Sequence, residues 1–183
     1  MRIVSSVIIV LALASPARLA GTAGQGPEAQ HDAHTGATSS AFVEEVRRAT
    51  ASFRDIRNLP AGYVPVLGCV SGPLVGAMGV HFLNPALLGD AVLDPAQPEA
   101  VIYEFKDGLA RLVGVEYIVQ AALWHVEHPP QDPPVLRDQL LNFENSPNRF
   151  GLPAFYELHV WAWRDNPNGV FVDWNPRVSC EGQ

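Results

Sequence analysis

Apolar residues near position 50 repeat with the period of a helix. They follow one another at spacings of four, three, four and three positions, which places them on one helical face: Phe42, Val46, Ala49, Phe53 and Ile56. Acidic residues stand in the first turn and arginines in the last, as the helix dipole favours. We therefore predict a helix over residues 41–58, which ends because Pro60 and Gly62 follow.

The pattern changes to short strands after residue 62. Residues 63–69 are mostly apolar but include Pro65, which has no N–H to donate to a neighbouring strand and so favours a sheet edge. Residues 76–83 alternate between two sides of a strand, with His81 on one of them. Together these segments predict the first two strands of a sheet.

Asp107-Gly108 predicts a tight hairpin. This pair favours a two-residue type I′ turn, so the numbers of opposite residues in strands 101–105 and 109–119 sum to 215. If no bulge interrupts the pairing near Gly114, Glu116 lies on the same sheet face as four large side chains: Tyr103, Phe105, Leu112 and Ile118. A carboxylate in such surroundings needs a partner, because an unpaired buried charge is costly.

The last apolar segment predicts a closing hairpin. Residues 156–163 alternate, residues 164–169 have the composition of a turn, and residues 170–174 form the returning strand. One helix followed by several short strands indicates an α+β fold. We expect an N-terminal helix packed on a mainly antiparallel curved sheet or small β-barrel.

The N-terminal region predicts export. Arg2 precedes an apolar run of about a dozen residues, and small residues continue to Ala23, as in a secretory signal peptide. The run is shorter than the about 20 apolar residues of a spanning helix, so we expect no stable membrane anchor after cleavage. Cleavage can follow Ala17 or Ala23, and a retained anchor is the alternative. We assign residues 1–23 to the signal peptide, 24–40 to a disordered leader and 41–183 to one domain.

The overall charge excludes one class of partner. The chain has 12 Lys and Arg against 19 Asp and Glu, a formal net charge of −7. Such a surface repels phosphate backbones, so we predict no nucleic-acid binding. The sequence also contains no nucleophile elbow, phosphate loop or dinucleotide-binding fingerprint.

The chain has two cysteines, Cys69 and Cys180. In an exported protein they predict a disulfide, which agrees with an extracytoplasmic location, either periplasmic or secreted. Two free thiols are the alternative.

Three polar residues, His81, Glu116 and His159, lie within predicted strands that are rich in apolar residues. Two imidazoles and a carboxylate that meet in a barrel mouth would bind a divalent transition metal, such as zinc, copper or non-haem iron. The alternative is a structural polar network in which Glu116 pairs with a histidine or an arginine.

The tryptophans Trp161, Trp163 and Trp174 offer a second kind of candidate site. Their rings could form a stacking platform for a sugar or a flat apolar ligand. The alternative is that they fill the core or an oligomer interface, because large aromatic side chains usually supply buried area.

Several short motifs follow one another in a fixed order: Gly62-Tyr63, Cys69, Met78-Gly79-Val80-His81, Asn84-Pro85, Tyr103-Glu104, Val115-Glu116-Tyr117, Tyr156-Glu157-Leu158-His159-Val160-Trp161, Asp173-Trp174-Asn175-Pro176 and Cys180. In this order they resemble a group of exported bacterial proteins for which no activity is established. The resemblance covers most of the chain after Ala41 and implies an exported α+β domain.

These observations predict an exported soluble domain that serves as a binding or structural module. If the tryptophans lie at an interface, the module forms a homo-oligomer. The alternative is a metal-binding protein or metal-dependent enzyme that uses His81, Glu116 and His159.

Overall fold

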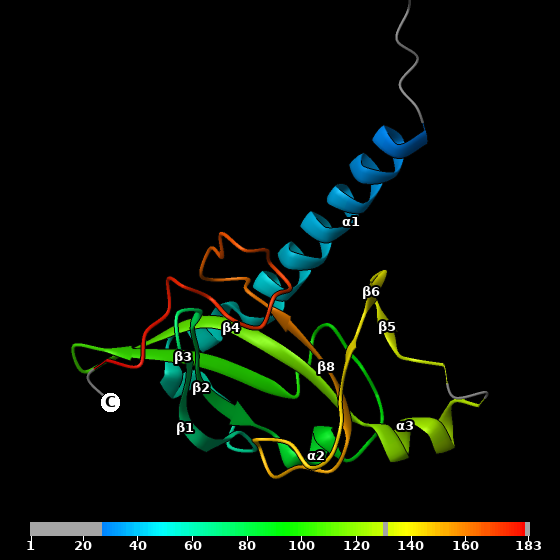
Figure 1. The fold of residues 1–183 in the computed structure, drawn as a ribbon. Helices are drawn as coiled ribbons and strands as arrows, with labels where there is room; N and C mark the ends of the chain where they lie inside the picture. The colour runs from blue at the N-terminus through cyan, green and yellow to red at the C-terminus, as the bar shows by residue number, and fades with distance from the viewer. Residues whose placement is uncertain (1–26, 130–131, 182–183) are drawn as a thin grey trace, which may run out of the picture.

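The computed structural model describes residues 27–129 and 132–181, with side chains from residue 39 onward. The protein has an α+β fold in which helix α1 (Pro27–Thr50) lies against one face of a curled, six-stranded antiparallel sheet that forms half a barrel (Figure 1). The predicted fold class is confirmed. The predicted signal peptide lies outside the described residues.

The sheet runs in the order β1, β2, β3, β4, β8, β7. These strands are β1 (Val64–Gly72), β2 (Gly76–Leu83), β3 (Ala100–Lys106), β4 (Leu109–Gln120), β7 (Asn142–Glu144) and β8 (Phe155–Val160). The remaining elements are η1 (Ala51–Arg54), η2 (Ile56–Asn58), α2 (Pro85–Leu88), α3 (Ala121–Glu127), β5 (Val135–Leu136) and β6 (Gln139–Leu140). The edge position predicted for the strand with Pro65 is confirmed, because β1 pairs only with β2.

Helix α1 begins and ends earlier than the apolar pattern predicts. It starts at Pro27, so residues 27–40, expected to be a disordered leader, are helical. The first turns project away from the sheet (Figure 1). Phe42 and Val46 are buried against the sheet and hold the C-terminal turns in place. Once such a nucleus exists, each added residue gains one hydrogen bond at little entropic cost, so the helix can continue outward.

The α-helix stops at Thr50 and continues as the short 3₁₀ helices η1 and η2. The hydroxyl of Thr50 donates a hydrogen bond to the carbonyl of Val46 at 2.7 Å and accepts one from Nε1 of Trp163 at 3.0 Å. Thr50 thus ties the last helical turn to the segment that follows β8.

One face of the sheet packs against α1. Phe42 and Val46 lie over a set of buried side chains from β4 and β8: Val115, Tyr117, Val119, Leu158 and Val160. Because side chains alternate along a strand, the residues between them, including Glu116 and His159, lie on the opposite face.

A β-bulge in β4 decides which face carries Glu116. Near the turn the pairing follows the predicted register, with Lys106 opposite Leu109 and Tyr103 opposite Leu112. The register then shifts, and Ala100 is opposite Glu116. An extra residue reverses the alternation beyond it. The prediction that Glu116 shares the face of Tyr103 is therefore wrong, because it assumed an uninterrupted ladder.

The predicted closing hairpin is also wrong. Strand β8 ends at Val160, and residues 170–174 form no strand. The reason is that β8 pairs with β4 on one side and β7 on the other, which leaves no free edge for a returning strand. The C-terminal segment instead crosses the sheet to β2, where Asn175 forms an antiparallel bridge with Ala77.

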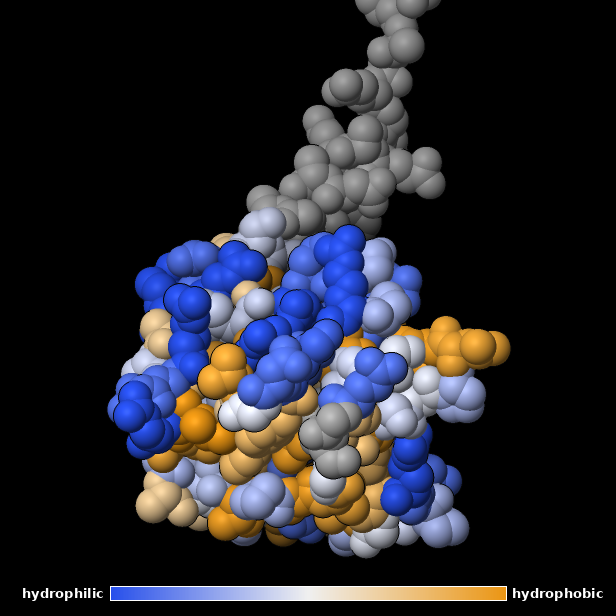
Figure 2. All heavy atoms as spheres, turned by 90° about the vertical axis from the view of Figure 1, so that its left-hand side faces the viewer, coloured by the Kyte–Doolittle hydropathy of each residue, from blue (hydrophilic) through white to orange (hydrophobic). Residues whose placement is uncertain are grey.

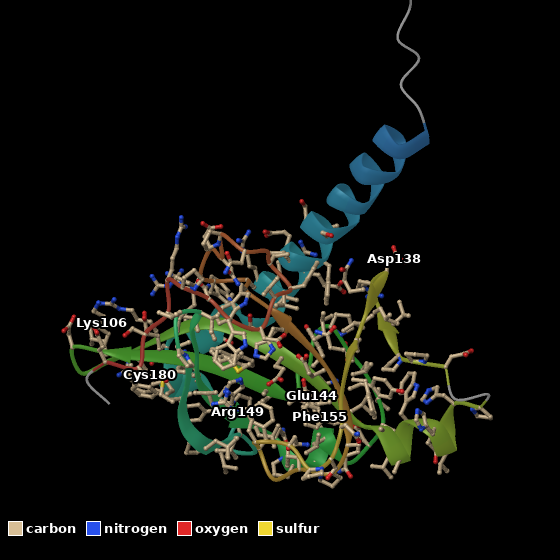
Figure 3. All side chains as sticks on the ribbon, in the orientation of Figure 1. Lys106, Asp138, Glu144, Arg149, Phe155 and Cys180 are labelled. Atoms are coloured by element: carbon tan, nitrogen blue, oxygen red, sulfur yellow. A yellow bond between two sulfur atoms is a disulfide. The ribbon has the colours of Figure 1, made fainter. Side chains whose placement is uncertain are left out.

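The disulfide between Cys69 and Cys180 is confirmed, with the two Cα atoms 5.6 Å apart. It joins the C-terminal segment to edge strand β1, and Cys180 lies on that side of the molecule (Figure 3). Within the described ranges, no helix combines the length and apolar character that crossing a membrane requires.

Large apolar side chains are also exposed, among them Leu74 and Val126. On the face seen in Figure 2, hydrophobic residues gather over the lower half and hydrophilic residues over the upper half, next to the N-terminal helix. The oligomer expected from the sequence stays a prediction.

We expect Gly76→Ala to be far more destabilising than Gly68→Ala. Both glycines have positive φ, which costs an alanine about 1 kcal/mol. A Cβ at Gly68 meets open space, whereas one at Gly76 overlaps the backbone carbonyl of Asn175. Overlap with a backbone adds about 2 kcal/mol or more, because the C-terminal segment must move. Urea unfolding of both variants measures the difference; equal midpoints would show that this contact does not hold the segment.

Candidate metal centre

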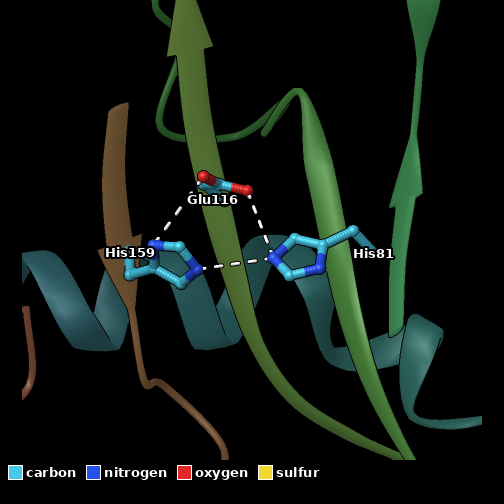
Figure 4. A group of neighbouring side chains, drawn as sticks. All are labelled: His81, Glu116 and His159. Atoms are coloured by element: carbon cyan, nitrogen blue, oxygen red, sulfur yellow. Dashed lines mark hydrogen bonds and ion pairs between the residues drawn. The ribbon is translucent and has the colours of Figure 1, made fainter. Parts of the chain in front are cut away.

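Three strands position the predicted metal ligands on the sheet face away from α1. His81 lies on β2, opposite Ile102 of β3, and Glu116 of β4 is directly opposite His159 of β8. The three side chains point toward one another across the concave face of the half-barrel (Figure 4). The bulge in β4 makes this arrangement possible, because it turns Glu116 to the face of Ile102.

The distances within the group are uniform. Nε2 of His81 lies 3.4 Å from Nε2 of His159 and 3.4 Å from Oε2 of Glu116, and Nδ1 of His159 lies 3.7 Å from Oε1 of Glu116. These separations exceed the about 2.9 Å of a good hydrogen bond. The two separations from Nε2 of His81 match the about 3.4 Å between two ligands of one tetrahedral ion, each about 2.1 Å from it. One ligand atom from each residue lies within 4.8 Å of the others.

Two further carboxylates, which the sequence analysis did not select for the metal site, complete the cluster. Oε2 of Glu157 lies 3.0 Å from Nδ1 of His159, and Oδ1 of Asp173 lies 3.9 Å from the same atom. Asn142 donates a hydrogen bond to the other oxygen of Glu157 at 3.1 Å. Strand alternation could have indicated Glu157, which stands two residues before His159. Asp173 comes from an irregular segment and carried no such signal.

Burial and neighbouring charges shift the pKa values of four side chains in the cluster. Burial raises the pKa of Glu116 to about 7 and lowers that of His81 to about 3, with the charge of His159 adding to the second effect. Burial also lowers the pKa of His159, but Glu116 and Glu157 together outweigh it and bring this pKa to about 9. Burial raises the pKa of Asp173, and Glu157 adds to the rise.

Positive partners for these acids are scarce. Across residues 27–129 and 132–181, no lysine or arginine forms an ion pair with Glu116, Glu157 or Asp173. Only His159 is available as a protonated partner. A bound cation would offset the remaining negative charge.

The polar network is also incomplete. Nδ1 of His81 is buried without a hydrogen-bond partner of normal geometry. Buried polar groups in a purely structural network are nearly all satisfied. The unpaired atom is on the opposite side of the ring from Nε2, which faces His159 and Glu116, so it does not distinguish a metal site from a structural network.

A small cavity of about 40 Å³ opens beside two of the three residues. His81 and Glu116 are part of its lining, and the other lining residues are apolar: Val66, Leu67, Met78, Leu83, Ala100, Ile118, Phe150, Leu152 and Phe155. The volume has room for about three water molecules.

The three tryptophans of the predicted stacking platform lie in three separate surroundings. Trp161 is 2% exposed and lies beside His159, so its faces are covered. Trp163 lies on the α1 side, where Thr50 accepts a hydrogen bond from it. Trp174 lies under the guanidinium of Arg149, which is 5.3 Å from the ring centroid. The alternative of aromatic residues that fill the core fits Trp161.

No protein-family model, curated protein or solved structure matches the chain. The resemblance to exported bacterial proteins therefore stays a prediction.

Proposed function

We propose that the protein is an exported metal-binding protein in which His81, Glu116 and His159 hold one divalent transition metal ion. The observation that carries this proposal is the spacing of about 3.4 Å between the two Nε2 atoms and from Nε2 of His81 to Glu116. It fits the edges of a metal tetrahedron better than it fits hydrogen bonds.

The donor set narrows the choice of metal. Two neutral imidazoles and one carboxylate suit zinc, copper or non-haem iron, rather than calcium or magnesium, which prefer all-oxygen sites. Three protein ligands leave at least one coordination position for water or another small molecule. Such an open position is the property that metal-dependent enzymes share.

Glu157 has a supporting role in this proposal. Its carboxylate accepts the hydrogen bond from Nδ1 of His159, which leaves Nε2 of the same ring for the metal. A carboxylate behind a histidine ligand fixes the ring orientation and its tautomer. Glu157 is thus a positioning residue.

We also propose an extracytoplasmic location. The Cys69–Cys180 disulfide supports it, because such bonds persist in oxidising compartments. We thus propose that the binding module expected from the sequence binds a metal ion. The excess of buried acidic side chains in the cluster favours this function over a purely structural one.

We expect His159→Ala and Glu116→Gln to lower zinc affinity by more than about 100-fold, because each removes a ligand from a three-ligand set. His128→Ala is the matched control, since His128 is exposed and stacks on Trp124 instead. Affinity is measured by competition with a chromophoric chelator after chelator treatment of the purified protein. Metal content after purification is measured by mass spectrometry.

Circular dichroism and thermal unfolding establish that each variant is folded. Glu116→Gln keeps the shape of the side chain, so it separates loss of a ligand from loss of the fold. If folded Glu116→Gln and His159→Ala bind zinc as the wild type does, or if the wild type binds no transition metal, the proposal fails.

A further inference from the structure

The cavity beside the cluster has two kinds of wall. Its polar groups are His81 and Glu116, and the rest of its lining is aliphatic or aromatic. Leu83, Ala100, Ile118 and Phe155 pack together as one side of this lining. A molecule that enters meets apolar surface everywhere except at the two residues that we propose as metal ligands.

The third ligand lies outside the cavity lining. His159 and its partner Glu157 do not line the cavity, although His159 lies 3.4 Å from His81. In Figure 4, His159 and His81 lie on opposite sides of Glu116. The protein thus closes the cluster on the β8 side, and the side formed by His81 and Glu116 faces the cavity.

The acidic side chains around the proposed metal position favour a ligand with a neutral donor atom over an anionic ligand. Glu116, Glu157 and Asp173 all lie within 3.9 Å of His159 or His81 and have no arginine or lysine partner in the described part of the chain. A divalent cation at this position would therefore lie among three acidic side chains and two histidines. An anionic ligand would meet repulsion in a poorly solvated site, whereas a neutral donor would not.

We propose that this cavity binds a small apolar molecule that bears one neutral oxygen donor, a hydroxyl or a carbonyl, which coordinates the metal. This inference rests on the proposed metal site. Apolar pockets with a few convergent polar groups are the usual form of small-molecule sites. The cavity has about 40 Å³ of room, so the ligand has only a few carbon atoms beyond its donor.

The test uses the full-length mature protein loaded with cobalt(II), whose visible absorption bands change when a ligand enters its coordination sphere. The protein is titrated with ethanol and, separately, with acetate, which has the same number of carbon atoms but an anionic head. We expect ethanol to change the bands in a saturable manner, with acetate at least about tenfold weaker.

A cavity-filling variant tests the location. Leu152→Trp places bulk in the cavity lining, whereas Leu140→Trp makes the same change at a side chain that is 62% exposed on β6. We expect Leu152→Trp to keep the cobalt bands and to weaken the ethanol response by about tenfold or more. Leu140→Trp is expected to respond as the wild type does.

The outcomes separate the two proposals. Cobalt bands that neither ligand changes, or that acetate changes as strongly as ethanol or more strongly, overturn the inference and leave the metal site intact. An equal response from Leu152→Trp and the wild type also overturns it. If no cobalt bands form at all, the metal site and the inference that rests on it fail together.

Discussion

At about pH 9, Glu99→Gln is expected to unfold at a higher urea concentration than the wild type, and at about pH 5 the two are expected to unfold at nearly the same concentration. Glu99 is 1% exposed, and burial raises its pKa to about 8. Oε2 accepts a hydrogen bond from the backbone N–H of Ile118 at 2.9 Å. The amide of glutamine can accept the same bond without a charge to bury.

The direction follows from proton binding. The folded state holds the Glu99 proton up to about pH 8, whereas the unfolded state releases it near its ordinary pKa of 4.5. The stabilising contribution is therefore complete below about pH 4.5 and is lost as the pH rises through about 8. Each pKa unit corresponds to about 1.4 kcal/mol, so the total loss is about 3–5 kcal/mol.

Urea titrations of both proteins between about pH 5 and pH 9 measure this loss. His81, Glu116 and His159 titrate in both proteins, so the difference between the two curves isolates Glu99. Curves that run parallel over this range would show that Glu99 is not protonated in the folded state.

The second large effect is expected from the disulfide. Cys69→Ser with Cys180→Ser is expected to lower the free energy of unfolding by about 4–5 kcal/mol, because the bridge spans 111 positions and restricts the unfolded chain. The cross-link also holds the C-terminal segment, which carries Asp173 and Asn175, against the sheet. Urea unfolding of the oxidised wild type, the reduced wild type and the double variant measures this contribution.

The reduced wild type serves as an internal comparison. It is expected to match the double variant, and a reducing agent is expected to leave the double variant unchanged. If the double variant and the oxidised wild type have the same midpoint, the bridge adds no stability and its role is confined to placing the segment.

Local signals in the sequence predicted the elements that depend on local chemistry. Asp107-Gly108 predicted a hairpin whose first four pairs follow the expected register. Pro65 predicted an edge strand, and the alternation over residues 76–83 matches β2 to its ends. In each case the deciding interaction lies within a few residues, where turn chemistry or a missing N–H acts directly.

The errors arose where the deciding contacts are distant in sequence. The predicted final hairpin failed because β7 occupies the second edge of β8, which no pattern within residues 156–174 can reveal. Helix α1 begins earlier because a packed segment supports the turns before it. Both outcomes depend on tertiary structure rather than local propensity.

In the candidate site, too, local sequence patterns predicted some features and contacts distant in sequence decided the others. The alternation patterns selected His81, Glu116 and His159, and the structure brings them together. The register needed for that meeting includes a bulge that the sequence analysis assumed to be absent. Glu157 was on the correct face of an alternating strand but was not considered for the metal site, and Asp173 reaches the site through the C-terminal segment.

Because of the bulge in β4, a one-residue deletion has a different consequence from a substitution. A substitution at His81 or His159 removes one proposed ligand and leaves the others in place. Loss of a single in-frame codon at the bulge would act differently, because it exchanges the two faces of the strand beyond it. Glu116 would then take the place of Val115 on the side of helix α1, and Tyr117 would take the place of Glu116 opposite His159. The number of residues in β4 thus decides both which side chain enters the candidate site and which side chains enter the hydrophobic core.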